Sequence, residues 1–177
     1  NVNYRTSHQI RIQADFLLSP EISDADGNTE ERNKTVSVFN GPNPAIQVAM
    51  DQDAEIEMVG KWITDRSNEG FMPHEFGVFV RSESELDRAS KAVNQAGLPF
   101  QVLDDKVETI SGQLSISTMH LAKGLEFRAV VVMACDDDVI PLQERIEKAS
   151  DDSELEEIYN TERHLLYVAC TRDRDQL

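Results

Sequence analysis

Apolar residues recur at the three- and four-residue spacing of an amphipathic helix in four segments of the chain. Thr6 or Ser7 is suited to cap the first of these helices. Ser82 and Glu85 form a capping-box pattern at the start of the third helix, and Gly97 follows as its expected C-terminal stop. The predicted helices lie within residues 4–18, 51–66, 82–95 and 153–172.

Short apolar runs between these segments predict strands. The run Phe76–Val80 is apolar throughout, as expected of a strand that is buried on both faces. The other predicted extended segments are 35–39, 46–50, 100–103, 114–119 and 129–134. Buried strands that alternate with helices favour parallel pairing. The sequence therefore predicts an α/β fold, a doubly wound and mainly parallel sheet flanked by helices, in a single domain over residues 1–177.

Charge is unevenly distributed along the chain. The net charge is −16, which repels phosphate at long range and argues against a simple polyanion-coating protein. Ten acidic residues fall within 136–157, however, and most basic residues lie outside this acidic segment. A local basic groove can act in such a molecule because salt screens distant charges. We interpret the acidic segment as a solvated face, with a basic protein partner as the alternative.

Two cysteines, Cys135 and Cys170, lie in apolar runs without metal-ligand spacing. Disulfide scaffolds and zinc modules are therefore poor interpretations, no metal site is predicted, and a reducing cytoplasm suits the chain. No apolar stretch approaches 18 residues, which excludes a predicted membrane span.

Two segments concentrate chemistry-bearing residues. Residues 116–127, ISTMHLAKGLEF, take a predicted strand into a loop with a histidine, a lysine, a glycine and a glutamate. Open α/β sheets bind ligands at strand carboxyl ends, so this loop is suited to phosphate and ribose, although a plain polar turn fits equally well. Residues 161–174, TERHLLYVACTRDR, place Arg172 and Arg174 at or past a helix end. They either offset the helix dipole or bind a phosphate.

Taken together, these segments resemble motifs of the superfamily 1 DNA helicases of the UvrD/Rep type. Residues 116–127 are similar to motif V, T-x-H-x-x-K-G-L-E-F, and residues 162–174 to motif VI, E-R-x-L-L-Y-V-A-x-T-R. Asn3–Thr6 resembles motif IV, N-Y-R-S/T, and Val78–Ser82 resembles the segment V-L-x-R-S/T. The resemblance covers nearly the whole chain in the right order. It implies the second RecA-like motor domain of an ATP-dependent helicase.

The resemblance also implies roles for individual residues at the nucleotide. Tyr4 would stack on adenine, and Arg5 would approach the γ-phosphate. Glu126 would bind the ribose, and Gly124 would let the backbone come close to the nucleotide. Arg172 would be the arginine finger.

Single-stranded DNA would meet a second group of residues. Arg81, Ser82, Thr118 and His120 match positions that touch the strand or couple it to the nucleotide. Translocation from 3′ to 5′ is implied as well. The remaining partner would be the first motor domain of the same protein, which would hold most of ATP and Mg²⁺.

The chain departs from the family pattern in several places. It contains no G-x-x-x-x-G-K-[ST], so it lacks the main ATP-binding half. Asp173 stands where the family usually has alanine, beside the expected finger, and could weaken or orient it. The acidic segment is longer than the usual connection and is expected to be an insertion. Leu177 ends the sequence straight after a predicted helix, which suggests an excised piece of a longer protein. A non-catalytic interaction module with vestigial motifs is the alternative function.

Overall fold

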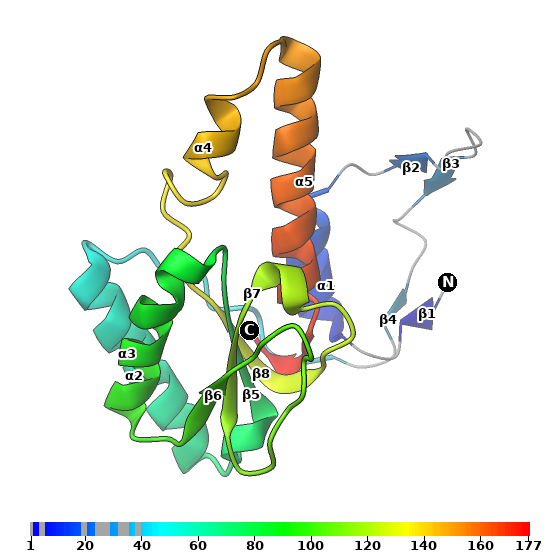
Figure 1. Ribbon diagram of the computed structural model, residues 1–177. Coiled ribbons are helices and arrows are strands. Elements are labelled where there is room, and N and C mark those ends of the chain that lie inside the picture. The colour runs from blue at the N-terminus through cyan, green and yellow to red at the C-terminus, as the bar shows by residue number, and fades with distance from the viewer. Residues whose placement is uncertain (1, 4–5, 19–20, 24–28, 32–35, 38–39) are drawn as a thin grey trace.

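A five-stranded sheet forms the centre of the molecule (Figure 1). The computed structural model describes all residues except 1, 4–5, 19–20, 24–28, 32–35 and 38–39. The strand order is β6-β7-β5-β8-β9, and every neighbouring pair is parallel. These strands are β5 (Phe76–Val80), β6 (Phe100–Val102), β7 (Leu114–Thr118), β8 (Phe127–Val132) and β9 (Asp173–Gln176).

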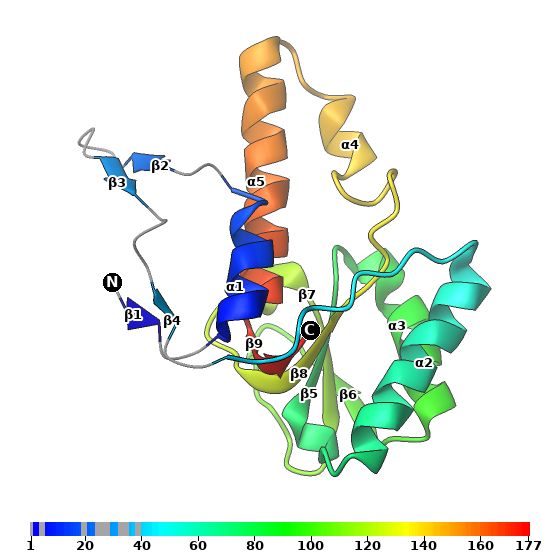
Figure 2. The same ribbon diagram turned by 180° about the vertical axis from the view of Figure 1, so that it is seen from behind.

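Helices cover both faces of this sheet, which confirms the predicted doubly wound α/β fold. On one face lie α2 (Gln52–Asn68) and α3 (Leu86–Ala96), which pack against each other. On the other face lie α1 (His8–Asp15) and α5 (Asp152–Cys170), as Figure 2 shows from behind. The amino-terminal half of α5 projects beyond the carboxyl ends of the strands, with the short helix α4 (Gln143–Ile146) beside it.

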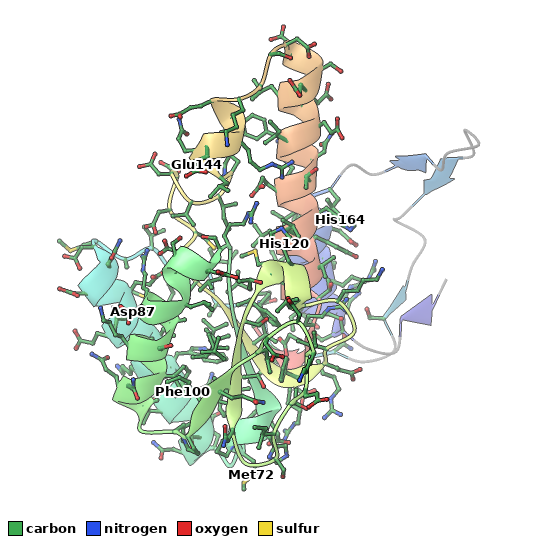
Figure 3. The ribbon with its side chains drawn as sticks, viewed as in Figure 1. Met72, Asp87, Phe100, His120, Glu144 and His164 are labelled. Atoms are coloured by element: carbon green, nitrogen blue, oxygen red, sulfur yellow. The ribbon has the colours of Figure 1, made fainter. Side chains whose placement is uncertain are left out.

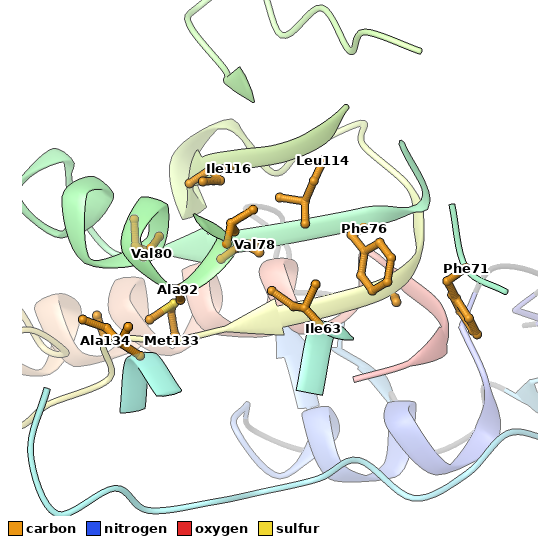
Figure 4. Packing of buried hydrophobic residues seen from close by; sticks show 14 residues of the cluster. Ile63, Phe71, Phe76, Val78, Val80, Ala92, Leu114, Ile116, Met133 and Ala134 are labelled. Carbon is orange, nitrogen blue, oxygen red and sulfur yellow. The ribbon is translucent and has the colours of Figure 1, made fainter. Parts of the chain in front are cut away.

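The central strand β5 divides its side chains between two hydrophobic clusters. Val78 and Val80 pack with Ile63 of α2 in the cluster below α2 and α3 (Figure 4). Phe79, between them, points to the other face and packs with Phe127 and Ala169. Successive residues of a strand face opposite sides of a sheet. This explains why Phe76–Val80 is apolar at every position rather than at alternate ones.

Short elements complete the described chain at its periphery. β1 (Val2–Asn3) pairs in parallel with β4 (Val36–Ser37), and β2 (Glu21–Ser23) pairs antiparallel with β3 (Thr29–Glu31). Three 3₁₀ turns are η2 (Pro73–Glu75), η3 (Glu83–Glu85) and η4 (Met119–Leu121). In the part of the chain that the structure describes, no helix is long and apolar enough to cross a membrane.

An extended segment, residues 41–45, lies along the outer side of β9. The Ala45 N–H donates to the carbonyl oxygen of Leu177 at 2.9 Å. A Cβ built on Gly41 would lie 3.3 Å from the carbonyl oxygen of Asp175, so the two backbones run close together. The free edge of β9 is therefore covered by the chain itself.

Several sequence-based predictions are borne out and others are wrong. Gly97 ends α3 with φ +69°, as predicted. The capping box is wrong, because the Ser82 hydroxyl pairs with the hydroxyl of Ser84 and η3 precedes the helix. The expected strand over 46–50 is absent, and its apolar side chains are exposed.

The observed bounds of further elements also differ from the predicted ones. The strand predicted over 129–134 occupies 127–132, because Ala134 has φ +57° and leaves the ladder. The sequence does not end directly after a helix, since β9 follows α5 and pairs with β8. The helix predicted within 4–18 is α1, which begins after its N-cap Ser7.

Gly77 of β5 provides a test of packing in the sheet. A Cβ on Gly77 would lie 2.5 Å from Cδ2 of Phe127, a ring fixed inside the second cluster. We therefore expect Gly77→Ala to lower the free energy of unfolding by about 1–3 kcal/mol, the usual cost of overpacking. Urea denaturation measures it.

Ser115 offers a matched control, because it is the register partner of Gly77 on β7. Its hydroxyl is buried and has no hydrogen-bond partner. Ser115→Ala should therefore leave stability unchanged or raise it. Equal stability of Gly77→Ala and the parent chain would contradict the close approach of Phe127.

Candidate functional site

The residues predicted to meet DNA gather at the carboxyl ends of two neighbouring strands. Arg81 and Ser82 follow β5, Thr118 is the last residue of β7, and His120 lies in the η4 turn that comes next. Because β5 and β7 pair in parallel, with Val80 opposite Thr118, these four residues share one edge of the sheet. We call it the carboxyl edge.

Arg81 is held there by a buried ion pair with Glu162 of α5. Its Nε donates to Oε2 of Glu162 at 2.5 Å, and its Nη2 donates to Oε1 at 2.6 Å. The Arg81 and Glu162 side chains are only 4% and 2% exposed. Two parallel bonds of this kind fix the plane of the guanidinium. Arg81 therefore cannot change direction without leaving Glu162.

A second guanidinium shares the same carboxylate. Nη1 of Arg145, on α4, donates to Oε1 of Glu162 at 3.1 Å. Burial raises the pKa of Glu162, but the hydrogen bonds and positive charges of Arg81 and Arg145 outweigh it and lower that pKa below its usual value. Glu162 is therefore ionised at neutral pH, and the three side chains together carry one net positive charge.

His120 lies beside this cluster near the carboxyl edge (Figure 3). Partial burial lowers the pKa of His120, and the charges of Arg81 and Arg145 lower it further, while Glu162 acts in the opposite direction. The ring is therefore neutral at pH 7. It can recognise an anion through a ring N–H but does not add a charge.

Two of the residues predicted to meet the nucleotide lie at the opposite edge. The Phe127 N–H donates to the carbonyl oxygen of Arg172 at 3.0 Å, so Glu126 and Arg172 are brought together where β8 and β9 begin. Residues 116–127 therefore do not form one loop at strand carboxyl ends, as the motif suggested. Thr118 and His120 lie at that edge, and Glu126 lies at the amino edge.

The chain before α1 reaches the same place. The Thr6 hydroxyl donates to the carbonyl oxygen of Thr171 at 3.2 Å, and both residues are buried. Tyr4 and Arg5 precede Thr6 but lie outside the described residues, so their predicted roles stay predictions. Gly124 has φ +91° and no atom within 4 Å of a built Cβ, so its backbone is open to approach.

Arg172 lies against the end of its own helix. Its Nε donates to the carbonyl oxygen of Val168 at 2.9 Å, and its Nη2 to the Thr171 hydroxyl at 3.3 Å. These bonds are the ones expected of a cation that offsets a helix dipole. Asp173, next to it, is fully buried, and its Oδ1 accepts the N–H of Asp175 at 3.0 Å.

The helix α5 connects the two edges. Glu162 and Arg172 are ten positions apart, which corresponds to about 15 Å along a helix axis. The acidic segment begins at Asp136, which is ion-paired with Arg88 of α3, and returns through Arg145 to Glu162. It is thus attached at two points, to α3 and to α5.

The motif comparison gave no role to Glu162 or Arg145. Glu162 lies inside the motif VI pattern, and this position was a signal in the sequence from which a buried, paired role could have been predicted. Arg145 had no such signal, because a basic residue within an acidic stretch is typical of an exposed surface. Within the described residues, no group of His, Cys, Asp and Glu is arranged to hold a metal ion.

Comparison with known proteins identifies the domain. The family model of the UvrD-like helicase C-terminal domain matches residues 104–177, which include Thr118, His120, Glu126 and Arg172. Residues 104–177 are therefore similar to the UvrD-like helicase C-terminal domain. Motif V and motif VI, the two segments singled out in the sequence, both fall inside this match.

Curated helicases are also similar to this chain. The ATP-dependent DNA helicase PcrA of Staphylococcus epidermidis is 41% identical over 73 residues, which is 41% of this chain and 9% of that protein. A probable DNA helicase II homolog of Mycoplasma genitalium is 28% identical over 167 residues, covering 89% of this chain and 21% of that protein. The chain therefore spans a small part of the length of these relatives.

The fold of the chain also has a solved counterpart. The C-terminal domain of a possible DNA helicase from a Lactobacillus strain, WCFS1, superposes with a TM-score of 0.64 at 20% identity. That match covers 99% of this chain and 84% of the other. It shows that the two domains share their fold.

The buried pair of Arg81 and Glu162 can be tested by mutation. Glu162→Leu leaves the Arg81 guanidinium buried without its carboxylate, so we expect a loss of about 3–5 kcal/mol in the free energy of unfolding. The double variant Arg81→Leu/Glu162→Leu removes both charges and should be more stable than Glu162→Leu alone. Chemical denaturation at pH 7 compares the variants.

An exposed ion pair serves as the control, because Asp87→Asn at the Lys91–Asp87 pair should leave the unfolding midpoint unchanged. The lowered pKa of Glu162 adds a pH signature. The contribution of ionised Glu162 to the free energy of unfolding is present above the usual glutamate pKa and is lost as pH falls through the lowered value. A double variant no more stable than Glu162→Leu would rule out an uncompensated buried charge as the cause.

Proposed function

We propose that this domain is the second motor domain of an ATP-dependent DNA helicase, with Arg172 as its arginine finger. In the intact protein it supplies one half of an ATP site and one half of a single-stranded DNA track. The family match and the helicase relatives support this assignment. Translocation from 3′ to 5′ and a cytoplasmic location belong to the same proposal.

One observation carries the proposal. Described residues of the predicted DNA group and of the predicted nucleotide group lie at different edges of the sheet, which supports separate roles for them. The DNA group, Arg81, Ser82, Thr118 and His120, occupies the carboxyl edge. Glu126 and Arg172, from the nucleotide group, meet at the amino edge through the Phe127–Arg172 backbone bond, although 46 positions separate them in sequence. A polar turn and a helix-end cation with no shared function do not require this proximity.

The amino edge fits part of a nucleotide. Glu126 is an exposed carboxylate that can accept ribose hydroxyls, and Gly124 presents open backbone. Arg172 supplies a cation with planar geometry. Mg²⁺ has no proposed ligand in this chain. ATP, when bound, supplies the γ-phosphoryl group whose transfer to water releases the free energy for movement.

The chain's own residues would act on that group from one side. Arg172 leaves the Val168 carbonyl and turns its guanidinium towards the phosphate, where charge grows in the transition state. Glu126 and the Gly124 backbone orient the sugar. Closure against the first motor domain is what brings these side chains to ATP, and reopening moves the carboxyl edge along the DNA.

Residues 1–177 alone should not hydrolyse ATP. The sequence has no phosphate-binding loop with its lysine, and one arginine cannot hold Mg²⁺-ATP. A phosphate-release assay with and without single-stranded DNA checks this. DNA-stimulated turnover by the purified chain, absent from a mock preparation, would overturn the division of the ATP site.

Arg172→Ala should lower ATP turnover of the intact helicase by about 10³-fold or more, as the loss of an arginine finger does. Arg172→Lys should recover little, because an ammonium does not reproduce the planar fork. Affinity for single-stranded DNA without nucleotide should change little, because Arg172 lies at the edge opposite Arg81 and His120. Turnover and DNA affinity are measured on the same preparations.

A different outcome is expected if Arg172 is only a helix-end cation. If the guanidinium only offsets the dipole of α5, Arg172→Ala loses about 0.3–1 kcal/mol of stability and keeps near-normal turnover. Normal turnover with a lowered melting temperature would remove the arginine-finger assignment. It would leave the family membership of the domain untouched.

A further inference from the structure

Two guanidiniums at the carboxyl edge are only partly used by their carboxylate. Arg81 donates through Nε and Nη2, and its Nη1 makes no hydrogen bond. Arg145 donates only through Nη1, and its side chain is 38% exposed. Among these described residues, Arg145 therefore keeps exposed donor nitrogens available, while a shared oxygen of Glu162 holds it beside the buried Arg81.

The charge of the cluster favours an anion. Glu162 neutralises one of the two guanidiniums, so one positive charge remains in a chain whose net charge is −16. Two neighbouring acidic side chains, Glu144 on α4 and Glu147 just after it, are exposed and therefore strongly screened by salt. The cluster is partly buried and is screened less. A local attraction for phosphate therefore survives beside the acidic segment.

We propose that Arg145 is a phosphate-contacting residue for single-stranded nucleic acid, held beside Arg81 and His120 by the carboxylate of Glu162. This inference rests on the proposed function and extends it to the acidic segment, which would then contribute to the DNA track as well as repel it. Guanidinium suits the task, because its planar set of donors can bind a phosphodiester while one Nη stays on Glu162. Glu162 is the positioning residue.

The test uses the 177-residue chain and a fluorescently labelled oligothymidylate. Binding is measured by anisotropy between about 50 and 200 mM salt. Each phosphate contact to a single strand adds about 0.7 to the slope of log affinity against log salt. Arg145→Gln should therefore make the slope shallower by about 0.7. Arg145→Lys, which keeps the charge, should retain the slope of the parent chain.

Lys61→Gln is the matched control. Lys61 is exposed on α2, which covers the other face of the sheet from α5, and its loss changes the net charge by the same amount. Its slope should equal that of the parent chain. Melting temperatures accompany every variant, and Glu162 retains both bonds to Arg81 in Arg145→Gln, so the fold is expected to persist.

The outcomes are distinct. Equal slopes for Arg145→Gln and the parent chain overturn the Arg145 contact and leave the proposed function standing. An equal decrease of the salt slope in Arg145→Gln and Lys61→Gln also overturns the Arg145 contact, since the change in net charge alone would explain it. Displacement of the oligonucleotide by inorganic phosphate at matched ionic strength, in the parent chain and not in Arg145→Gln, supports the proposal, because phosphate and the strand then compete for Arg145. A parent chain that binds no oligonucleotide overturns the DNA role itself.

Discussion

The arrangement of the carboxyl edge depends on one buried carboxylate. Glu162 receives three hydrogen bonds from two arginines that come from different parts of the chain, one after β5 and one on α4. Moving charges out of water is costly, and the cost is offset only when the partners are close and well aligned. The position of α5 relative to the sheet, the direction of Arg81 and the attachment of α4 are therefore linked. None of them can change alone.

This link gives the acidic segment a different meaning from the one its composition suggests. Composition predicts a solvated face that keeps polyanions away. The structure ties that segment to α3 through Asp136 and to α5 through Arg145, next to His120. Its exposed carboxylates still repel phosphate at long range. At short range, where contacts rather than net charge decide binding, it places a guanidinium at the edge.

Local patterns predicted most of the fold because burial on both faces leaves a clear signature. Phe76–Val80 was predicted with the bounds that it has, and Gly97 ends α3 as a residue that accepts positive φ. Patterns failed where a tertiary contact decides. Ala134 leaves β8 with positive φ, and its N–H binds Glu55 of α2. At Ser82 a local contact decides instead, because its hydroxyl pairs with that of Ser84 and does not cap a helix.

The candidate site was only half predictable for the same reason. Motif V suggested one loop because its residues are close in sequence. In a parallel sheet, however, the connection between two strands carries the chain from the carboxyl edge back to the amino edge. Thr118 and Glu126 are eight positions apart and lie at opposite edges. Glu126 and Arg172 are distant in sequence and lie together. Register and topology, which depend on the whole sheet, decide both.

The segment that covers β9 also affects how the molecule can associate with other protein molecules. An exposed edge strand presents unpaired backbone groups that a strand of another molecule can join, and such joining starts aggregation. Residues 41–45 occupy that position, with Ala45 bonded to Leu177 and Gly41 close to Asp175. On the side of β9, the connecting segment of the chain itself, which contains Pro42 and Pro44, therefore limits intermolecular growth of the sheet.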